Sequence, residues 1–215
     1  MAVGKRLQGG AAAVLGQGSG PAAAEAIRVQ KSMIIEVFEM GNAGGMDENG
    51  LGEETFTAQT LAKALEGGAR AEIWTGSWQE TFALGRQLGE SSRPGQVYAL
   101  VGDLGVGKTV FTQGFASGLG IAGPVNSPTF TILQTYEDGR LPFYHFDVYR
   151  IQDVEEMDEI GYEDCFYGEG VCLVEWGNLI QEILPENSIC VTIEKDLERG
   201  FDDRRILVGR EPKGF

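Results

Sequence analysis

One segment of eight residues, 102–109, constrains the fold of this 215-residue chain more than any other. It reads GDLGVGKT and fits the pattern G-x-x-x-x-G-K-[ST], in which glycines let backbone N–H groups turn inward around a phosphate. The segment follows an apolar run, QVYALV at 96–101, and opens an expected helix at 108–119. A buried strand, a glycine-rich loop and a helix whose positive end points at that loop together predict a phosphate-binding site rather than a purely structural turn.

Each residue type in the loop has a chemical reason to be there. We expect the Lys108 ammonium to contact the β- and γ-phosphates of a nucleotide and the Thr109 hydroxyl to bind Mg²⁺. Asp103 is an anion inside an anion-binding loop, so it either points away from the phosphates or accepts from the N–H groups of the loop. The candidate nucleotide-binding residues of the loop are Gly102, Asp103, Leu104, Gly105, Val106, Gly107, Lys108 and Thr109.

A phosphate loop of this kind works with a further acid at the end of a neighbouring strand, and the chain offers two. Glu175 follows the apolar run VCLV at 171–174, and Asp147 lies within YHFDVYR at 144–150. Either acid binds Mg²⁺ directly, binds it through water, or orients the attacking water. The alternatives are that Glu175 is a surface acid that caps the next segment, and that Asp147 forms a turn or an ion pair with Arg150.

Two other features near these acids are ambiguous in the sequence. SPTF at 127–130 either senses a γ-phosphate, as the segment after the first helix does in many P-loop proteins, or is an ordinary proline loop before a strand. His145 is the only histidine, so the chain can form neither a Ser-His-Asp triad nor a histidine metal cluster. It is either a packed residue of a strand or a direct participant in chemistry.

The order of the elements indicates an α/β fold. Helices are expected at 77–90, where Ser77 and Glu80 form a capping pattern, and at 108–119, 153–160 and 179–184. Strands are expected at 96–101, 143–149 and 171–174, with closing strands at 189–193 and 205–208. We therefore predict a three-layer fold like that of P-loop NTPases, with a mostly parallel central sheet flanked by helices.

Composition divides the chain into two parts, an extension over residues 1–70 and a P-loop domain over 71–215. The first part holds 13 of the 32 glycines but two of the 20 aromatic residues, so it can bury little apolar surface. We expect it to be largely disordered, with a strand at 32–39 and a short helix at 57–65. A disordered leader is favoured over a targeting peptide, because residues 1–24 are poor in arginine and their apolar part is interrupted.

The charge of the chain excludes several function classes. The net charge of −15 argues against a protein that binds nucleic acid mainly through phosphate neutralisation, and against a polybasic membrane-surface protein. Three cysteines supply neither a disulfide framework nor a paired zinc pattern, and no apolar run is long enough to span a membrane. These observations favour a cytoplasmic protein.

Four motifs taken together resemble one family. GDLGVGKT at 102–109, SPTF at 127–130, YHFDVYR at 144–150 and LVEW at 173–176 are similar to the motifs of the bacterial TsaE (YjeE) family, P-loop ATPases of tRNA threonylcarbamoyladenosine synthesis. The resemblance covers about residues 72–208. It implies an ATPase with ATP and Mg²⁺ as cofactors that works with TsaD and TsaB. Those partners transfer a threonylcarbamoyl group to adenosine 37 of tRNAs reading ANN codons, and the chain itself would meet tRNA only through the complex.

The resemblance also assigns roles to site residues. It implies that Thr109 and Glu175 are Mg²⁺ ligands, and that Lys108, Asp147 and Glu175 form the catalytic set. Trp176, next to Glu175, belongs to the family signature, with a role in packing or in partner contact.

Two further positions come from the resemblance. Trp78 falls where the family makes its first nucleotide-side contact, and its indole either stacks on adenine or packs in the core. Arg204 matches a position that lines the nucleotide site, although the adjacent Arg205 leaves that placement uncertain by one residue.

Two other functions are compatible with a phosphate loop. A small-molecule kinase usually needs an arginine-rich lid, and no such segment stands out in residues 71–215. A nucleotide-dependent scaffold would use the same residues as an ATPase, so the sequence does not separate these two hypotheses.

Overall fold

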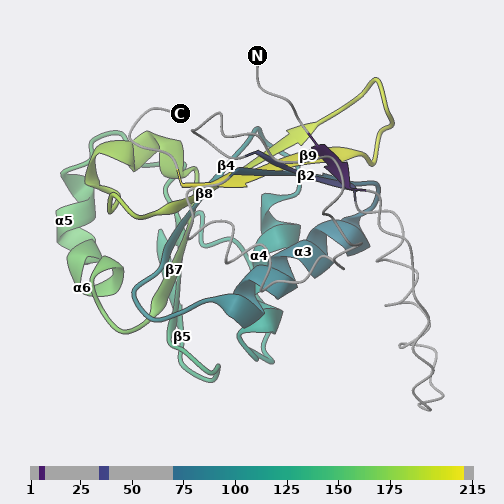
Figure 1. Ribbon diagram of the computed structural model, residues 1–215. Helices are drawn as coiled ribbons and strands as arrows, with labels where there is room; N and C mark the ends of the chain where they lie inside the picture. Colours follow the sequence, from purple (N-terminus) through teal and green to yellow (C-terminus); the bar gives the residue numbers. More distant parts are fainter. Residues whose placement is uncertain (1–4, 8–33, 39–69, 211–215) are drawn as a thin grey trace, which may run out of the picture.

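The structure is a computed structural model, and it describes residues 5–7, 34–38 and 70–210 (Figure 1). A single nine-stranded sheet forms its centre, in the order β1-β2-β3-β9-β8-β4-β7-β6-β5. The strands are β1 Lys5–Leu7, β2 Ile34–Phe38, β3 Arg70–Thr75, β4 Val97–Val101, β5 Leu133–Tyr136, β6 Phe143–Asp147, β7 Val171–Glu175, β8 Ile189–Lys195 and β9 Arg204–Gly209.

The four central strands, β8, β4, β7 and β6, are all parallel to one another. This confirms the predicted fold class and its parallel centre. Both flanks of the sheet are antiparallel, which the sequence analysis did not foresee: β5 pairs with β6, and β9, β3, β2 and β1 continue the sheet beyond β8. The pairs β5–β6 and β8–β9 are each joined by a short connection, which permits only antiparallel pairing.

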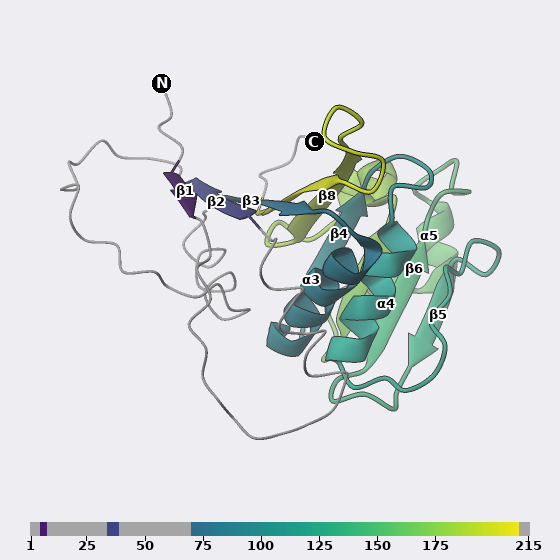
Figure 2. The ribbon, with the colours of Figure 1, turned by 90° about the vertical axis from the view of Figure 1, so that its right-hand side faces the viewer.

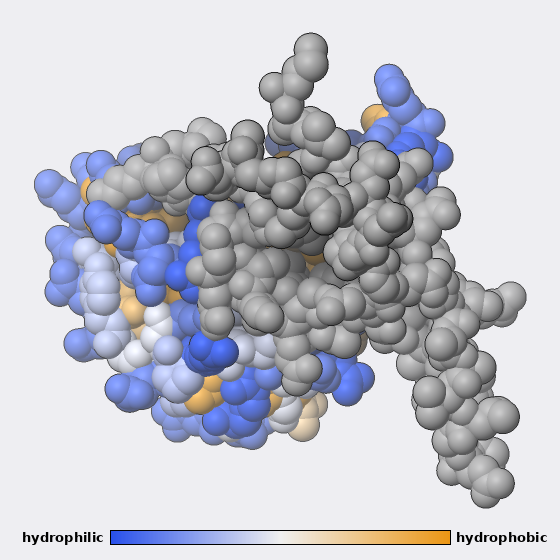
Figure 3. All heavy atoms as spheres, viewed as in Figure 1, coloured by the Kyte–Doolittle hydropathy of each residue, from blue (hydrophilic) through white to orange (hydrophobic). Residues whose placement is uncertain are grey.

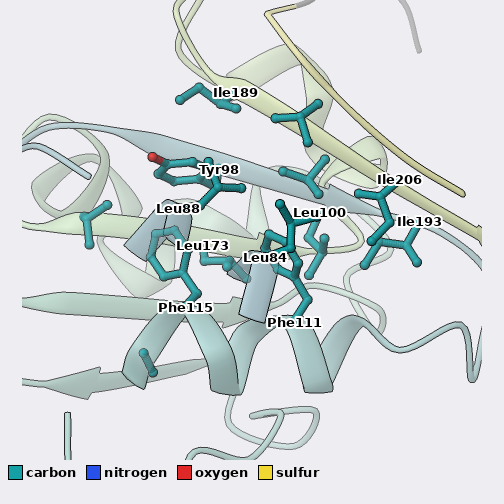
Figure 4. Packing of buried hydrophobic residues seen from close by; sticks show 14 of the residues in the cluster. Leu84, Leu88, Tyr98, Leu100, Phe111, Phe115, Leu173, Ile189, Ile193 and Ile206 are labelled. Carbon is teal, nitrogen blue, oxygen red and sulfur yellow. The ribbon is translucent and has the colours of Figure 1, made fainter. Parts of the chain in front are cut away.

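Helices cover both faces of the sheet. Strand β4 shows why, because it is apolar on both sides and each side must be shielded from water. Tyr98 and Leu100 of β4 point into the larger core, with Leu84, Phe111 and other residues of α3 and α4 (Figure 4). Val97 and Ala99 belong to the second core, which packs against the opposite helices. The three layers are therefore α3 Trp78–Ser91 and α4 Lys108–Gly118 on one face, the sheet, and α5 Glu156–Ile160, α6 Tyr162–Phe166 and the 3₁₀ helix η1 Gly177–Ile183 on the other face.

Helices α3 and α4 lie side by side and touch through their backbones (Figure 2). A Cβ atom added to any of four glycines would lie 2.0–2.2 Å from a carbonyl oxygen of the other helix. Gly85 faces Phe111 and Gly89 faces Phe115, so the two helices run in the same direction. The four glycines are Gly85, Gly89, Gly114 and Gly118.

Side chains close both ends of α3. The Ser77 hydroxyl accepts from the Glu80 N–H at 3.3 Å, which confirms the predicted N-terminal cap, and Glu80 Oε2 accepts from the Gly76 N–H at 2.6 Å. At the other end, Arg140 Nη2 donates to the carbonyls of Gly89 and Ser92. These bonds satisfy backbone groups that a helix leaves unpaired at its ends.

Most predicted elements are confirmed, and the exceptions are short. The expected helix at 153–160 is reduced to α5, and the one at 179–184 is the 3₁₀ helix η1. Strands β1, β3 and β5 and helix α6 were not predicted, and β1 lies within the leader that was expected to be disordered. In the predicted N-terminal extension, the strand at 32–39 is confirmed as β2, which pairs with β1 and β3. The expected helix at 57–65, and most of the extension predicted to be disordered, lie outside the described residues.

Among the described residues, no helix has the length and apolar character needed to cross a membrane. On the face shown in Figure 3, hydrophilic side chains predominate outside the grey residues, and hydrophobic ones are scattered among them.

Candidate active site

Two acids meet at the carboxyl end of the parallel sheet. Glu175 ends β7 and is opposite Leu100 of β4 on one side and Asp147, the last residue of β6, on the other. The phosphate loop leaves β4 at this same edge, where ligands of open α/β sheets bind. Glu175 is 2% exposed and Asp147 is 3% exposed, so the hypothesis that Glu175 is a surface acid is wrong.

The backbone of the phosphate loop requires its glycines. Gly102, Gly105 and Gly107 have φ angles of 148°, 75° and 111°, a region that side chains disfavour. A Cβ on Gly102 would also lie 2.3 Å from the carbonyl oxygen of Ile193 in β8. Leu104 and Asp103 are exposed, and α4 begins at Lys108 as predicted. The loop therefore has the conformation and the following helix that the sequence motif predicts.

Lys108 is buried at the centre of the loop. Its Nζ donates to the carbonyl oxygens of Gly102 at 2.7 Å and Asp103 at 2.9 Å, and it lies 3.7 Å from the ring centroid of Trp176. Burial lowers the pKa of Lys108, and the charges of Glu175 and Asp147 oppose this effect. The Lys108 ammonium is therefore buried within electrostatic reach of both candidate acids.

Trp176 packs against two residues at the site. It has a left-handed backbone with φ of 63°, an uncommon conformation for a bulky residue. Its ring covers the Lys108 ammonium and lies against Tyr149, with ring centroids 4.9 Å apart.

Asp147 is held by the segment that follows α4. Its Oδ2 accepts from Thr129 Oγ1 at 2.8 Å and from Ser127 Oγ, and its Oδ1 accepts from the Tyr149 N–H at 3.1 Å. The last bond confirms the turn-forming alternative for Asp147. Arg150, considered as an ion-pair partner, instead lies over the ring of Phe130 at 4.6 Å. The SPTF segment thus contacts a candidate catalytic acid through two hydroxyls.

Glu175 is held from both the sheet and α4. Its Oε1 lies 3.0 Å from His145 Nε2 and 3.2 Å from Thr112 Oγ1. His145 is fully buried on β6 and stacks on Phe143, with ring centroids 5.9 Å apart. The packed alternative for His145 is therefore confirmed, and the same residue also touches the candidate metal acid.

A carboxylate that faces the first turns of a helix after a phosphate loop suits Mg²⁺. Thr112, which contacts Glu175, follows Thr109 by less than one turn of α4. Nucleotide-bound Mg²⁺ takes one or two protein oxygens and completes its shell with phosphate and water. The Thr109 hydroxyl and the Glu175 carboxylate have the chemistry of that donor set.

The two remaining predicted positions also lie at this end of the molecule. Arg204 Nε donates to the carbonyl oxygen of Val106 in the phosphate loop at 2.7 Å, whereas Arg205 pairs with Glu72. The contact therefore favours Arg204 over its neighbour. Trp78 is 63% exposed, so the hypothesis that it is a core residue is wrong. It is the first residue of α3, which runs parallel to α4.

The comparisons with known proteins agree with the motifs. Residues 75–206 match the family model described as "Threonylcarbamoyl adenosine biosynthesis protein TsaE". The chain belongs to the TsaE family. The TsaE family protein of Bacillus subtilis (strain 168), a tRNA threonylcarbamoyladenosine biosynthesis protein, is 50% identical over 128 residues, which are 60% of this chain and 78% of that protein. Its counterpart in Treponema pallidum (strain Nichols) is 44% identical over 117 residues, 54% of this chain and 86% of that protein.

A solved structure resembles this chain in its fold. The crystal structure of YdiB from Bacillus subtilis aligns with a TM-score of 0.57 and 41% sequence identity, covering 66% of this chain and 86% of that chain. About two thirds of the chain therefore shares the fold of that solved structure.

Sequence reasoning on this TsaE family chain missed Thr112 and the bonds that Ser127 and Thr129 form with Asp147. Thr112 lies one helical turn after Lys108, and that spacing could have placed it on the same side of α4. Ser127 and Thr129 were singled out, but their bonds to Asp147 depend on a contact across about 20 residues that no local pattern encodes.

Proposed function

We propose that this chain binds and hydrolyses ATP with Mg²⁺, and that this turnover supports threonylcarbamoylation of adenosine 37 in tRNAs that read ANN codons. It would act in the cytoplasm with TsaD and TsaB, which carry out the transfer itself, and it would meet tRNA through them. Membership of the TsaE family supports the pathway. The net charge of −15 is consistent with partners that hold most of the tRNA.

One observation carries the ATPase proposal. Asp147 and Glu175 lie at adjacent register positions at the carboxyl end of the sheet, and the charges of both act on the buried Lys108. A phosphate chain in the loop would place its γ-phosphate near this group, where positioning and charge neutralisation provide most of the catalysis in phosphoryl transfer.

The residues of the chain would divide these tasks. Backbone N–H groups of the loop and Lys108 would bind the phosphates, and Thr109 and Glu175 would hold Mg²⁺, which neutralises charge on the β- and γ-phosphates when bound. Asp147, fixed by the hydroxyls of Ser127 and Thr129, would orient the attacking water. The exposed Trp78 and the loop-bound Arg204 are the candidates for contacts to the rest of the nucleotide.

The test is ATP hydrolysis by the purified full chain, alone and with TsaD and TsaB, with Glu175→Gln as the matched variant. We expect slow turnover that changes when the partners are added and that falls in the variant. An absence of nucleotide binding in every mixture would refute the proposal. Binding without turnover in any mixture would replace it with the scaffold hypothesis, as would full tRNA modification by Glu175→Gln.

A further inference from the structure

His145 occupies a position that packing alone does not explain. It is the only histidine of the chain and is fully buried, and among the described residues its Nδ1 has no hydrogen-bond partner. An unpaired polar atom in the core is unfavourable, and an apolar ring would stack on Phe143 without that cost. The contact that an apolar ring could not make is the one between Nε2 and Glu175 Oε1, at 3.0 Å.

The geometry of Glu175 shows what this contact provides. Oε1 of Glu175 has two neighbours, His145 Nε2 and Thr112 Oγ1. A carboxylate oxygen accepts hydrogen bonds, so this contact is a hydrogen bond in the tautomer of His145 that carries its proton on Nε2. Both neighbours contact Oε1, which leaves Oε2 as the oxygen that can bind a water molecule or a metal ion.

The two donors are not equivalent. The Thr112 hydroxyl has one proton and two acceptors within reach, the Lys108 carbonyl oxygen at 3.0 Å and Glu175 Oε1 at 3.2 Å. That proton is shared between them. Within the part of the chain that the structure describes, the Nε2 atom of His145 has no second hydrogen-bond partner besides Glu175. His145 is therefore the principal donor to Glu175.

We propose that His145 is a positioning residue for ATP hydrolysis, which donates Nε2–H to Oε1 of Glu175 so that Oε2 remains for the metal ion or water at the phosphate loop. The inference rests on the proposed ATPase function. Residues that orient ligands of a metal site commonly affect activity by about 10- to 100-fold.

Three variants of the full chain separate positioning from packing. His145→Leu removes the donor, and we expect kcat for ATP hydrolysis to fall about 10- to 100-fold with little change in KM. His145→Gln keeps an N–H donor near the position of Nε2 and is expected to restore most of kcat. Thr112→Val, which removes the shared proton, is expected to have a smaller effect than His145→Leu.

The matched control is Phe143→Leu, which disturbs the same strand and the stacking partner of His145 without touching Glu175. We expect it to lower the unfolding temperature and to leave kcat of the folded protein unchanged. Equal losses of kcat in His145→Leu and Phe143→Leu would indicate a packing role and overturn the inference, as would an unchanged kcat in His145→Leu.

A spectroscopic measurement tests the inference without turnover. Because the chain has one histidine, a two-bond ¹H–¹⁵N spectrum of the tag-free protein reports the His145 ring alone. We expect the proton on Nε2, and a change of the Nε2 resonance in Glu175→Gln. The inference would be overturned by a proton on Nδ1. It would also be overturned by an Nε2 chemical shift that stays the same in Glu175→Gln. Failure of wild-type hydrolysis in every mixture would instead refute the proposed function, and this spectrum would still show whether His145 donates to Glu175.

Discussion

At the scale of single residues, Lys108 is the residue whose side chain joins the phosphate loop to Trp176. Its ammonium is buried, bonded to two loop carbonyls and covered by Trp176. Among the described residues it forms no ion pair within 4.0 Å, which agrees with the proposed role of its charge in binding phosphate.

Lys108→Ala is expected to weaken ATP binding about tenfold or more, because a hydrogen bond to a charged group contributes about 1.5–3 kcal/mol. Titration of the full chain with ATP and Mg²⁺ by calorimetry measures the effect. Arg86→Ala, which removes an exposed positive charge paired with Glu90, is the control and should bind ATP as the wild type does. Equal affinity of Lys108→Ala and the wild type would contradict the placement of the phosphates in this loop.

The residues of the loop, and both acids, could be predicted from sequence because their spacing is local. The contacts that hold the acids could not. His145 and Glu175 are 30 residues apart, and they meet because β6 and β7 pair in a register that joins Asp147 to Glu175. A one-residue slip in that register would turn His145 to the opposite face of the sheet.

At the scale of elements, the pairing of α3 with α4 rests on glycine rather than on large side chains. Helix α3 was predicted from its apolar spacing and its cap, and α4 from its place directly after the phosphate loop. The importance of their glycines could not be predicted, since glycine in a helix usually indicates only a weak helix former. It follows from the distance between the two backbones, which no single helix encodes.

Gly114→Ala is expected to destabilise the protein by about 1–3 kcal/mol or more, because the new methyl group would lie 2.0 Å from the Phe82 carbonyl oxygen. This outweighs the gain of about 1 kcal/mol that alanine normally brings to a helix. Urea unfolding followed by circular dichroism measures the difference. Gly123→Ala, at a position with open space, is the control, and a Gly114→Ala protein as stable as that control would refute the backbone contact.

The strands that were missed differ in their exposure. In β5, which forms one edge of the sheet, Gln134 and Thr135 are exposed, so an apolar signal was absent there. In β3 the residues alternate between half-buried and buried, a period of two that was detectable. Strand β3 was not predicted because it begins at residue 70, where the composition boundary with the glycine-rich segment was placed.

At the scale of the whole molecule, the central parallel strands could be predicted and the antiparallel flanks could not. Alternating strands and helices indicate parallel neighbours, whereas β9 inserts between β3 and β8, which are more than 110 residues apart in the sequence. Pairing between such distant segments is decided by the burial of whole faces. Composition and local sequence patterns therefore do not predict which distant strands pair.

Alkaline pH is expected to destabilise the whole domain through Tyr98. Burial raises the pKa of Tyr98 from its usual value near 10 to about 12. Between these values the unfolded chain loses the phenol proton and the folded chain keeps it, so stability falls as pH rises from about 10 to 12, by about 2–3 kcal/mol.

Urea midpoints of the wild type and of Tyr98→Phe, measured from pH 9 to pH 12, test this expectation. The variant is expected to lose less stability over this range than the wild type. Burial also raises the pKa of the Cys172 thiol, so some pH dependence should remain in the variant. Tyr167→Phe, at an exposed tyrosine, should follow the wild type. Parallel curves for Tyr98→Phe and the wild type would show that Tyr98 does not contribute.

The backbone contact between α3 and α4 also limits where the chain can change length. Each residue inserted into an α-helix rotates everything after it by about 100°. An insertion in α4 between Lys108 and Gly114 would replace Gly114 and Gly118 at the contact with Gln113 and Ser117, whose side chains have no room there. The number of residues between the phosphate loop and the helix contact is therefore fixed, and insertions or deletions can be accommodated only in the loops.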